Sequence, residues 1–528
     1  MSKGLPSEQQ LPLAMLMARN GFEVNPSQPL GRQSAGASFL EAYFRFSGNQ
    51  LHRIIVPKKK EAKWFHQQAE HWIPGCRTQA VKIEHWGNIS KASGCFYTPD
   101  PMLDTWAWRR MPWGDAAFSL LGVVHTLCSE KVQRSLGQFS SAPIRNWDAL
   151  ICTSIAAQKA VTGFLERQEE WIKQRHGSSR FERPALPVIP LGIHPEDWEP
   201  KNQKEAKFRA RKDLGIHANA EIVLIAGRLD LMTKTQPAPM LRALAELQQS
   251  EHPNLELLVY GEAPNPEMQK LWLKGAHQLA PLLKIHWVPG KESSLAAKVR
   301  WAADVFISLS DNPQETFGIT PLEAMAAGIP CLVSDWDGYR DTVIQPNESE
   351  SATGFRVPTR LKEGLGKEEA HGLLHNTIDY SLAVGQLAQG IAVDIKVFKE
   401  SLSILLASSD LRLAMGEAGR RRVRTNYSWH VIIEQWRDLI QELNHRRKHY
   451  QFESATPPQL PPWLQDTSVS FGCFASEILP SSWLPQPPNQ KLEHEFISNP
   501  FQSWDTDLLK HRSARRHGWW LKEGLVDL

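Results

Sequence analysis

Short apolar runs alternate with longer amphipathic stretches along most of this chain. Apolar runs bounded by turn residues predict buried strands, and the stretches between them predict helices. Strands that alternate with helices favour parallel sheets covered by helices on both faces. The expected strands are residues 51–56, 120–124, 150–153 and 187–190 in a first set, with helices at 39–46 and 156–173, and residues 221–226, 255–260, 284–288, 305–309 and 331–334 in a second set. The pattern therefore predicts an α/β protein with two doubly wound, Rossmann-like domains.

The two sets of strands are separated by a polar stretch rich in proline and acidic residues at 194–204. We expect a first domain at residues 1–195 and a second at 196–427. Residues 428–450 follow as one amphipathic helix, with Ile432, Trp436 and Leu439 among the apolar positions on one side. From residue 451 to 528 repeated prolines and isolated tryptophans forbid long helices or strands. This irregular Pro/Trp-rich tail is expected to pack over the globular body through its Trp side chains.

Composition argues against a nucleic-acid-binding, disulfide-rich or membrane-spanning protein. A net charge of +3 on 528 residues is too near balance to indicate a nucleic-acid binder. The six cysteines are scattered without paired Cys-x-x-Cys spacing, which predicts a reducing compartment and neither a zinc site nor a disulfide framework. No secretory signal and no apolar run long enough to span a bilayer is apparent. A cytoplasmic location is expected, and basic runs at 58–60 and 420–422 allow contact with anionic lipid.

The most informative stretch places two carboxylates, Glu315 and Glu323, on either side of seven residues. It lies between a predicted strand and an Ala-rich helix that ends at Gly328. Ligands of α/β sheets bind at the carboxyl end of a strand and against the N-terminus of the next helix. The amides at residues 317–319, in Phe317, Gly318 and Ile319, are therefore expected to face a bound anion. A second interpretation needs no ligand: a Thr three residues before Glu323, with Pro between them, also matches a helix capping box.

Two cations follow a strand of the second set. Arg228 comes directly after Gly227, at the end of the strand expected at 221–226, and Lys234 follows shortly after. A site for an anionic ligand must supply cations or aligned amides to balance the negative charge. The alternative is that both residues are solvated charges at a helix start.

The run from Glu315 through Glu323 to Asp335, Asp341 and Val343 resembles the signature of retaining glycosyltransferases of family 4, which have the GT-B fold. The resemblance covers residues 31–450. It implies that Glu315 lies against the transferred sugar and that Glu323 holds the ribose of a sugar nucleotide.

The resemblance also assigns roles outside that run. It implies that Arg228 and Lys234 bind the diphosphate, although one extra residue separates them here relative to the family pattern. It further implies that the helix at 428–450 crosses back to the first domain. His125, at the end of a predicted strand, matches a family histidine near the donor sugar, whereas a lone His after an apolar run is more often a core residue.

Two further donor-binding positions are expected. Gly31 and Gly36 lie in a Gly-containing stretch before a helix that matches a flexible loop over the donor phosphates, and a plain surface turn fits it equally. Val288, at a strand end followed by Pro and Gly, is expected near the nucleotide base. The residue types there do not separate uracil from guanine or adenine.

Asp335 and Asp337 have the Asp-x-Asp spacing with which another glycosyltransferase fold holds a metal-bound diphosphate. The GT-B architecture does not need the ion, so we expect no metal and no other cofactor. Asp337 and Asp341 are interpreted as carboxylates favoured by the dipole of the helix that follows them.

The resemblance therefore implies a GT-B enzyme, a retaining hexosyltransferase. It would move a sugar from a UDP-, GDP- or ADP-linked donor to a carbohydrate, lipid or small-molecule acceptor. Glu315, His125, Arg228 and Lys234 are the expected catalytic residues, and the departing phosphate is expected to take the acceptor proton. The alternatives are another GT-B activity, such as a nucleotide-sugar epimerase or a sugar-phosphate synthase, and a non-catalytic scaffold that works through its tail.

Overall fold

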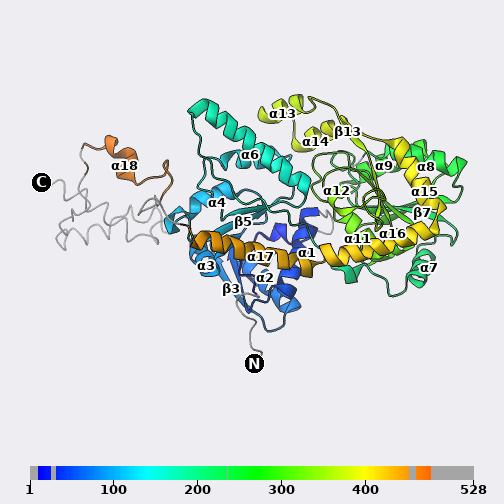
Figure 1. Cartoon of the computed structure of the whole chain (residues 1–528), viewed down its shortest axis with the longest axis horizontal. Coiled ribbons are helices and arrows are strands. Elements are labelled where there is room, and N and C mark those ends of the chain that lie inside the picture. The colour runs from blue at the N-terminus through cyan, green and yellow to red at the C-terminus, as the bar shows by residue number, and fades with distance from the viewer. Residues whose placement is uncertain (1–9, 25–30, 235, 451–459, 477, 479–528) are drawn as a thin grey trace, which may run out of the picture. The chain divides into compact units, whose positions relative to one another are not determined.

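The structure of the chain is a computed structural model that describes residues 10–24, 31–234, 236–450, 460–476 and 478. The chain divides into one unit at Met1–Gln459 and a second at Leu460–Leu528. The first unit contains two six-stranded sheets with helices around them, which Figure 1 shows as successive parts of the chain.

The N-terminal sheet has the strand order β3-β2-β1-β4-β5-β6, and all its pairings are parallel. This is the order of a doubly wound sheet, whose direction of winding reverses between β1 and β4. Its strands are β1 (Ala14–Leu16), β2 (Leu51–Val56), β3 (Arg77–Lys82), β4 (Cys95–Tyr97), β5 (Ser119–Val123) and β6 (Ala149–Ile151), and its helices are α1 (Gly31–Phe46), α2 (Lys59–Trp72), α3 (Trp86–Ser93), α4 (Leu103–Arg110), α5 (Glu130–Gln138) and α6 (Ile155–His176).

The C-terminal sheet repeats this topology in the order β12-β11-β10-β7-β8-β9, again with parallel pairings. Its reversal of winding lies between β7 and β10. Its strands are β7 (Glu221–Ala226), β8 (Leu255–Gly261), β9 (Lys284–Pro289), β10 (Val305–Ser308), β11 (Cys331–Ser334) and β12 (Gly354–Val357), and its helices are α7 (Gln203–Asp213), α8 (Ala238–Ser250), α9 (Pro266–Leu279), α10 (Ala296–Ala302), α11 (Thr320–Ala327), α12 (Tyr339–Thr342), α15 (Ile395–Ala407) and α16 (Ser409–Arg422). The predicted α/β architecture with two doubly wound domains is confirmed.

Two segments depart from this repeat. Between β12 and α15 the chain forms a small antiparallel pair, β13 (Thr359–Leu361) and β14 (Ile391–Val393), with α13 (Lys367–Leu374) and α14 (Tyr380–Ala388) between its strands. After α16, a π-helical turn leads into α17 (Trp429–Lys448), whose buried face joins the core of the N-terminal sheet (Figure 1). Trp436 of α17 packs against the rings of Phe39 and Tyr97 at centroid distances of 4.8 and 5.2 Å.

The chain passes between the two sheet domains twice, and the two passages are hydrogen-bonded to each other. The N–H of Ile193 donates to the carbonyl of Tyr427 at 2.9 Å, and the N–H of Trp429 donates to the carbonyl of Ile193 at 3.0 Å. Gly192 is needed beside them, because a Cβ at that position would lie 2.6 Å from the indole of Trp429. The outgoing and returning segments thus form one paired crossing.

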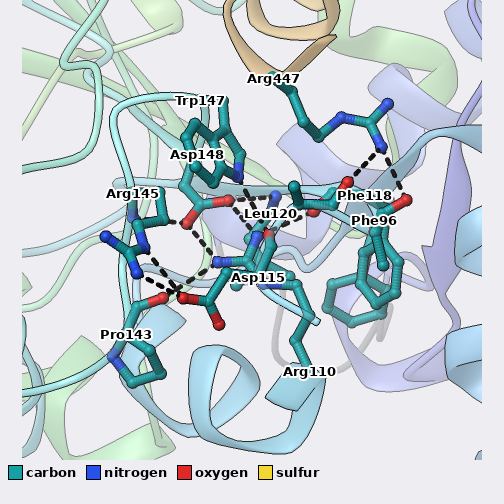
Figure 2. A network of polar contacts seen from close by, with 12 residues as sticks. Phe96, Arg110, Asp115, Phe118, Leu120, Pro143, Arg145, Trp147, Asp148 and Arg447 are labelled. Carbon is teal, nitrogen blue, oxygen red and sulfur yellow. Dashed lines mark hydrogen bonds and ion pairs between the residues drawn. The ribbon is translucent and has the colours of Figure 1, made fainter. Parts of the chain in front are cut away.

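A buried ion pair holds the N-terminal sheet together at the edge where β5 and β6 begin (Figure 2). Arg110 and Asp148 are fully buried, and two guanidinium nitrogens donate to the two carboxylate oxygens at 2.6 and 2.8 Å. Asp148 also accepts from the amides of Leu120 and Arg145, and Arg110 donates to the carbonyl of Phe118. A paired and hydrogen-bonded charge is the form in which a buried ion is tolerated. This network fixes the edge of the sheet that is opposite the carboxyl ends of the strands.

One predicted strand is not formed, and most of the tail lies outside the described residues. Residues 187–190 form no strand, because Val188 pairs only through an isolated bridge with Cys152. In the tail, the described residues include the short helix α18 (Thr467–Phe471) and Trp463, whose exposed fraction is 65%. The expected packing of the other tail tryptophans falls on residues 479–528, which lie outside the described residues.

Candidate active site

The reversal of winding in the C-terminal sheet brings the two predicted halves of the site together. Strands β7 and β10 are neighbours in the sheet, and both end at the same edge because they are parallel. Arg228 follows β7, and the loop that carries Glu315 follows β10. The crevice at such a reversal is where open α/β sheets bind ligands.

Lys234 and Glu315 form an ion pair across this crevice. Lys234 Nζ donates to Glu315 Oε2 at 2.8 Å, with exposed side-chain fractions of 32% and 15%. Burial alone would raise the pKa of Glu315. The charge and hydrogen bond of Lys234, together with the charge of Arg228, outweigh burial and lower the pKa, so Glu315 is ionised at neutral pH. The extra residue between the two cations does not prevent Lys234 from reaching the site.

Arg228 has no partner among the residues that the structure describes. Its guanidinium forms no hydrogen bond or ion pair with any residue in the described parts of the chain, although its charge acts on Glu315. A partly buried cation without a protein partner is available to an anionic ligand.

Side chains of the loop after β10 hold the loop that carries Lys234. Asn312 donates to the carbonyl of Lys234, and Gln314 Nε2 donates to the carbonyl of Thr233 at 3.1 Å. From the other side, the N–H of Lys234 donates to the carbonyl of Asp230 at 3.1 Å. These bonds fix the ammonium group before any ligand arrives, so little reorganisation is needed on binding.

The turn between Glu315 and α11 depends on glycine. Gly318 has φ +79°, and a Cβ there would lie 2.1 Å from a ring carbon of Tyr339. The N–H of Phe317 donates to the carboxylate of Glu315, so this amide orients the side chain and is not free for a ligand. The amides of Gly318 and Ile319 donate to no other described residue. Two of the three predicted amides therefore remain available at the start of α11.

Glu323 is held by an arginine that the sequence did not indicate. Arg300 of α10, whose exposed fraction is 2%, donates from Nη2 to Glu323 Oε2. The guanidinium lies 4.4 Å from the ring centroid of Trp198. No described residue donates to the other carboxylate oxygen of Glu323. The capping-box interpretation is wrong, because the N-cap of α11 is Ile319 and no side chain caps it.

The N-terminal sheet domain contributes the opposite wall through five hydrogen bonds, one of which joins Cys128 Sγ and Tyr380 Oη at 3.0 Å. Thr316 Oγ1 donates to the carbonyl of His125 at 3.0 Å, and Thr153 Oγ1 donates to the carbonyl of Thr316 at 3.2 Å. Ser154 Oγ donates to Asp337 Oδ1 at 2.7 Å. At the same distance of 2.7 Å, the N–H of Ile155 donates to Asp341 Oδ2.

The last two contacts add to the interpretation of the acidic residues after β11. Asp337 accepts a hydrogen bond from the amide of Gly338, the N-cap of α12, and Asp341 lies in the first turn of that helix. Both carboxylates also accept hydrogen bonds from the start of α6 in the other domain, from Ser154 and Ile155. Burial and the nearby charge of Glu315 raise the pKa of Asp337 to about 7, although the hydrogen bond from Ser154 acts in the opposite direction. Asp337 also has φ 43°, which is uncommon outside glycine. Such a carboxyl group in a cleft is a candidate functional group.

The remaining predicted positions lie at the edges of the site. Gly31 and Gly36 belong to α1 and not to a flexible loop, and a Cβ on Gly36 would lie 1.9 Å from the carbonyl of Gly21, so this glycine lets α1 approach the backbone. Gly36 and His125 line one small cavity of about 20 Å³. Val288 is a buried ladder residue of β9, paired with Tyr260, whose ring is 5.8 Å from the guanidinium of Arg300.

A larger pocket of about 460 Å³ opens between the two sheet domains. We call it the cleft pocket. Its walls come from α5, α6 and the loop after β5 on one side and from α12, β13 and the loops after β10 and β11 on the other. Glu315, Asp335, Asp337 and Arg340 are among its lining residues.

The Asp-x-Asp pair has protein partners. Asp335 is paired with Arg340 and Arg356, each at 3.1 Å, and Asp337 accepts from Ser154. Among the described residues, no group of three or more His, Cys, Asp or Glu side chains is placed to hold a metal ion. In the same residues, no helix is long and apolar enough to cross a membrane.

Sequence comparison finds a family match within the C-terminal sheet domain and several related proteins. Residues 206–369 match the profile of the family described as glycosyl transferases group 1. The chain is 26% identical over 264 residues to D-inositol 3-phosphate glycosyltransferase of Corynebacterium jeikeium, covering 49% of this chain and 52% of the relative. It is 25% identical over 247 residues to spore coat protein SA of Bacillus subtilis, covering 46% of this chain and 53% of the relative. The chain thus spans about half the length of the curated relatives it matches.

Solved structures extend the likeness in fold across both sheet domains. Sucrose-phosphate synthase from Thermosynechococcus elongatus superposes with a TM-score of 0.51 at 19% identity, covering 82% of this chain and 99% of that one. A glycosyltransferase from Rickettsia africae superposes with a TM-score of 0.55 at 16% identity, covering 82% and 98%. The chain has the GT-B fold and resembles the glycosyl transferases group 1 family.

Proposed function

We propose that this chain is a retaining hexosyltransferase that moves a sugar from a nucleotide-diphosphate donor to an acceptor alcohol. The observation that carries the proposal is the arrangement at the reversal of the C-terminal sheet, where Lys234 is paired with Glu315 and Arg228 has no partner among the described residues. One free cation, one oriented cation and the open amides of Gly318 and Ile319 suit a diphosphate group.

The proposed reaction follows from these positions. The bond between the anomeric carbon and the diphosphate oxygen breaks, and a bond forms between that carbon and the acceptor oxygen. The acceptor proton passes to the departing phosphate. Arg228 and Lys234 stabilise the charge that develops on the phosphate, an effect that is largest when the charges are held in place in advance. Glu315 accepts hydrogen bonds from the sugar hydroxyls.

Glu323 is proposed to bind the ribose of the donor. Arg300 occupies one carboxylate oxygen, and the other receives no bond from the described residues. Because Arg300 holds the carboxylate in place, its second oxygen is a ready acceptor for ribose hydroxyls. We propose further that the reaction needs no metal, since the two cations supply the positive charge. Chelation with EDTA should then leave the rate unchanged, whereas loss of activity restored by magnesium or manganese would contradict this part of the proposal.

A thermal-shift screen of UDP-, GDP- and ADP-linked sugars on the full chain tests donor binding directly. A donor at 100 times its dissociation constant stabilises the folded protein by about 2.7 kcal/mol. We expect one nucleotide class to raise the melting temperature of the wild type, and a smaller rise in the Arg228→Ala variant. If no sugar nucleotide stabilises the protein at millimolar concentration, the proposed function is wrong.

The stereochemistry is tested once a donor is known. We expect the anomeric configuration of the transferred sugar in the product, read by proton NMR, to equal that of the donor. An inverted product would exclude the retaining mechanism and leave only the transferase assignment.

A further inference from the structure

The cleft pocket begins where the proposed donor site ends. Glu315 lines it, but Arg228 and Lys234 do not. The rest of its wall comes from both sheet domains, and its volume is about 460 Å³. A molecule in this pocket would therefore lie beside the sugar that contacts Glu315, on the side away from the diphosphate cations.

One wall of the cleft pocket is apolar. Ala156, Ala160 and Phe164 line it and recur every four residues along α6, which places them on one face of that helix. Leu361 lines it from the other side, and its exposed fraction is 62%. Because apolar side chains on both sides face the same space, an apolar ligand group would leave water on entering it.

The described residues that line the cleft pocket offer no unpaired cation. Arg340 is the only cation among them, and it is paired with Asp335 at 3.1 Å. The carboxylates of Glu315 and Asp335 are likewise paired, with Lys234 and with Arg340 and Arg356. A phosphorylated ligand would therefore leave water without gaining an unpaired cation, and burying a charge without a partner is costly.

We propose that the cleft pocket binds the acceptor, and that the acceptor is an uncharged molecule with a hydroxyl group beside an apolar chain, of which an alkyl glycoside is the simplest form. The assignment to an acceptor rests on the proposed glycosyltransferase function. The carboxyl groups of Glu315 and Asp337 accept hydrogen bonds from its hydroxyl groups, and the apolar chain lies along α6 and Leu361. This chemistry differs from that in the name of the D-inositol 3-phosphate glycosyltransferases, whose named substrate carries a phosphate.

Direct binding measurements on the full chain test the proposal without any enzyme assay. The probes are n-octyl β-D-glucopyranoside below its micelle concentration, glucose, and inositol 3-phosphate, each titrated by calorimetry. We expect octyl glucoside to bind at least about tenfold more tightly than glucose, since each methylene transferred from water adds a factor of about four. Inositol 3-phosphate should bind most weakly. Tighter binding of inositol 3-phosphate, or equal binding of octyl glucoside and glucose, would overturn the proposal.

Two matched variants locate the binding site. Ala160→Trp fills the pocket from an exposed position of α6, and Lys159→Trp places the same side chain on the neighbouring exposed residue, which does not line the pocket. We expect the first to lose octyl glucoside binding and the second to keep it. Leu361→Ser removes the opposite apolar wall from an exposed site and should weaken binding by about tenfold. Unchanged binding in Ala160→Trp and Leu361→Ser would place the ligand elsewhere and refute the site.

The outcome is separable from that of the proposed function. Donor binding, measured by thermal shift, should be the same in Ala160→Trp as in the wild type, because the donor residues do not line the blocked part of the pocket. If octyl glucoside binds as expected but no sugar nucleotide does, the glycosyltransferase assignment fails while the ligand class of the pocket holds. If sugar nucleotides bind but octyl glucoside does not, the acceptor class is wrong.

Discussion

Replacing Arg228 by Ala isolates the contribution of one charge to phosphate stabilisation. Arg228 has no bond to the described residues, so its removal leaves no protein group unpaired and should not change the melting temperature by itself. A unit charge about 4 Å from a phosphate oxygen interacts with it by about 4 kcal/mol at an effective dielectric constant of 20. Loss of one preorganised donor typically costs about 2.7–4 kcal/mol of transition-state stabilisation. We therefore expect turnover to fall by about 10² to 10³.

The assay pairs kinetics with binding. The value of kcat/KM is measured with the donor identified by the screen, and dissociation constants are measured for the corresponding nucleoside and nucleoside diphosphate. In the wild type the diphosphate should bind much more tightly than the nucleoside, and Arg228→Ala should reduce that difference without changing nucleoside affinity. Arg242→Ala is the matched control, because Arg242 is an exposed arginine of α8 outside the site.

Three results would contradict this role of Arg228. A folded Arg228→Ala protein with wild-type turnover would show that the guanidinium does not face the phosphates. An equal loss of affinity for nucleoside and diphosphate would show that Arg228 contacts another part of the ligand. A large drop in melting temperature without ligand would mean that Arg228 has a structural role.

Three further variants test the neighbouring charges. Lys234→Ala should lower the free energy of unfolding by about 1–3 kcal/mol in chemical denaturation, because it leaves the mostly buried carboxylate of Glu315 without its partner. The ion pair stabilises the protein above the ordinary pKa of Glu, and this stabilisation is lost as pH falls through the lowered pKa of Glu315. A variant that loses stability at acid pH in the same way as the wild type would contradict the pairing. Glu323→Gln should weaken donor binding and should also lower the free energy of unfolding by about 3 kcal/mol, because Arg300 is then buried without a counter-charge. Replacing both Glu323 and Arg300 by Leu should restore the stability but not the donor affinity. The pKa of Asp337 is raised from 3.8 to about 7. The protonated side chain therefore contributes stability that is fully present below pH 3.8 and is lost as pH rises through about 7, so the melting temperature should fall between these two pH values. Asp337→Asn should make this fall smaller, and a variant with the same dependence of melting temperature on pH as the wild type would refute the prediction.

The sequence predicted those parts of the fold whose signal is local. The strands at 51–56, 221–226 and 331–334 match β2, β7 and β11, because each is an apolar run buried in its sheet. The edge strand β3 was missed because most of its residues are exposed and its side chains are largely polar, as befits an edge. β12 was missed because it begins at a glycine, which is unfavourable in strand interiors.

The site shows the same division. Arg228, Lys234 and Glu315 each follow a strand, so their convergence could be expected from the topology, and the resemblance named their roles. The contact between Glu323 and Arg300 could not be expected from the sequence. Arg300 is 23 residues away on a different helix, and no motif around it indicates this contact. The contact of Asp341 with Ile155, 186 residues apart, exists only because the two domains meet. The helix at Gly31 was read as a loop because glycine is a poor helix former, and the close approach of Gly36 to Gly21 overrides that preference.

The paired crossing at Ile193 and Tyr427 joins the two domains at one side of the cleft, and hydrogen bonds join them at the other side. The two segments of the crossing hold each other, so we expect a separation of the domains to pivot there and to be largest at the far side of the cleft. Five hydrogen bonds lie on that side, two at Thr316 and one each at Asp337, Asp341 and Tyr380. At about 1 kcal/mol net each, releasing them together costs about 5 kcal/mol, so the open form is about two ten-thousandths of the population. A substrate too large to enter the closed cleft would bind only to the open form, so its apparent affinity would be reduced by that fraction. The rate of domain opening would then limit the rate at which this substrate binds.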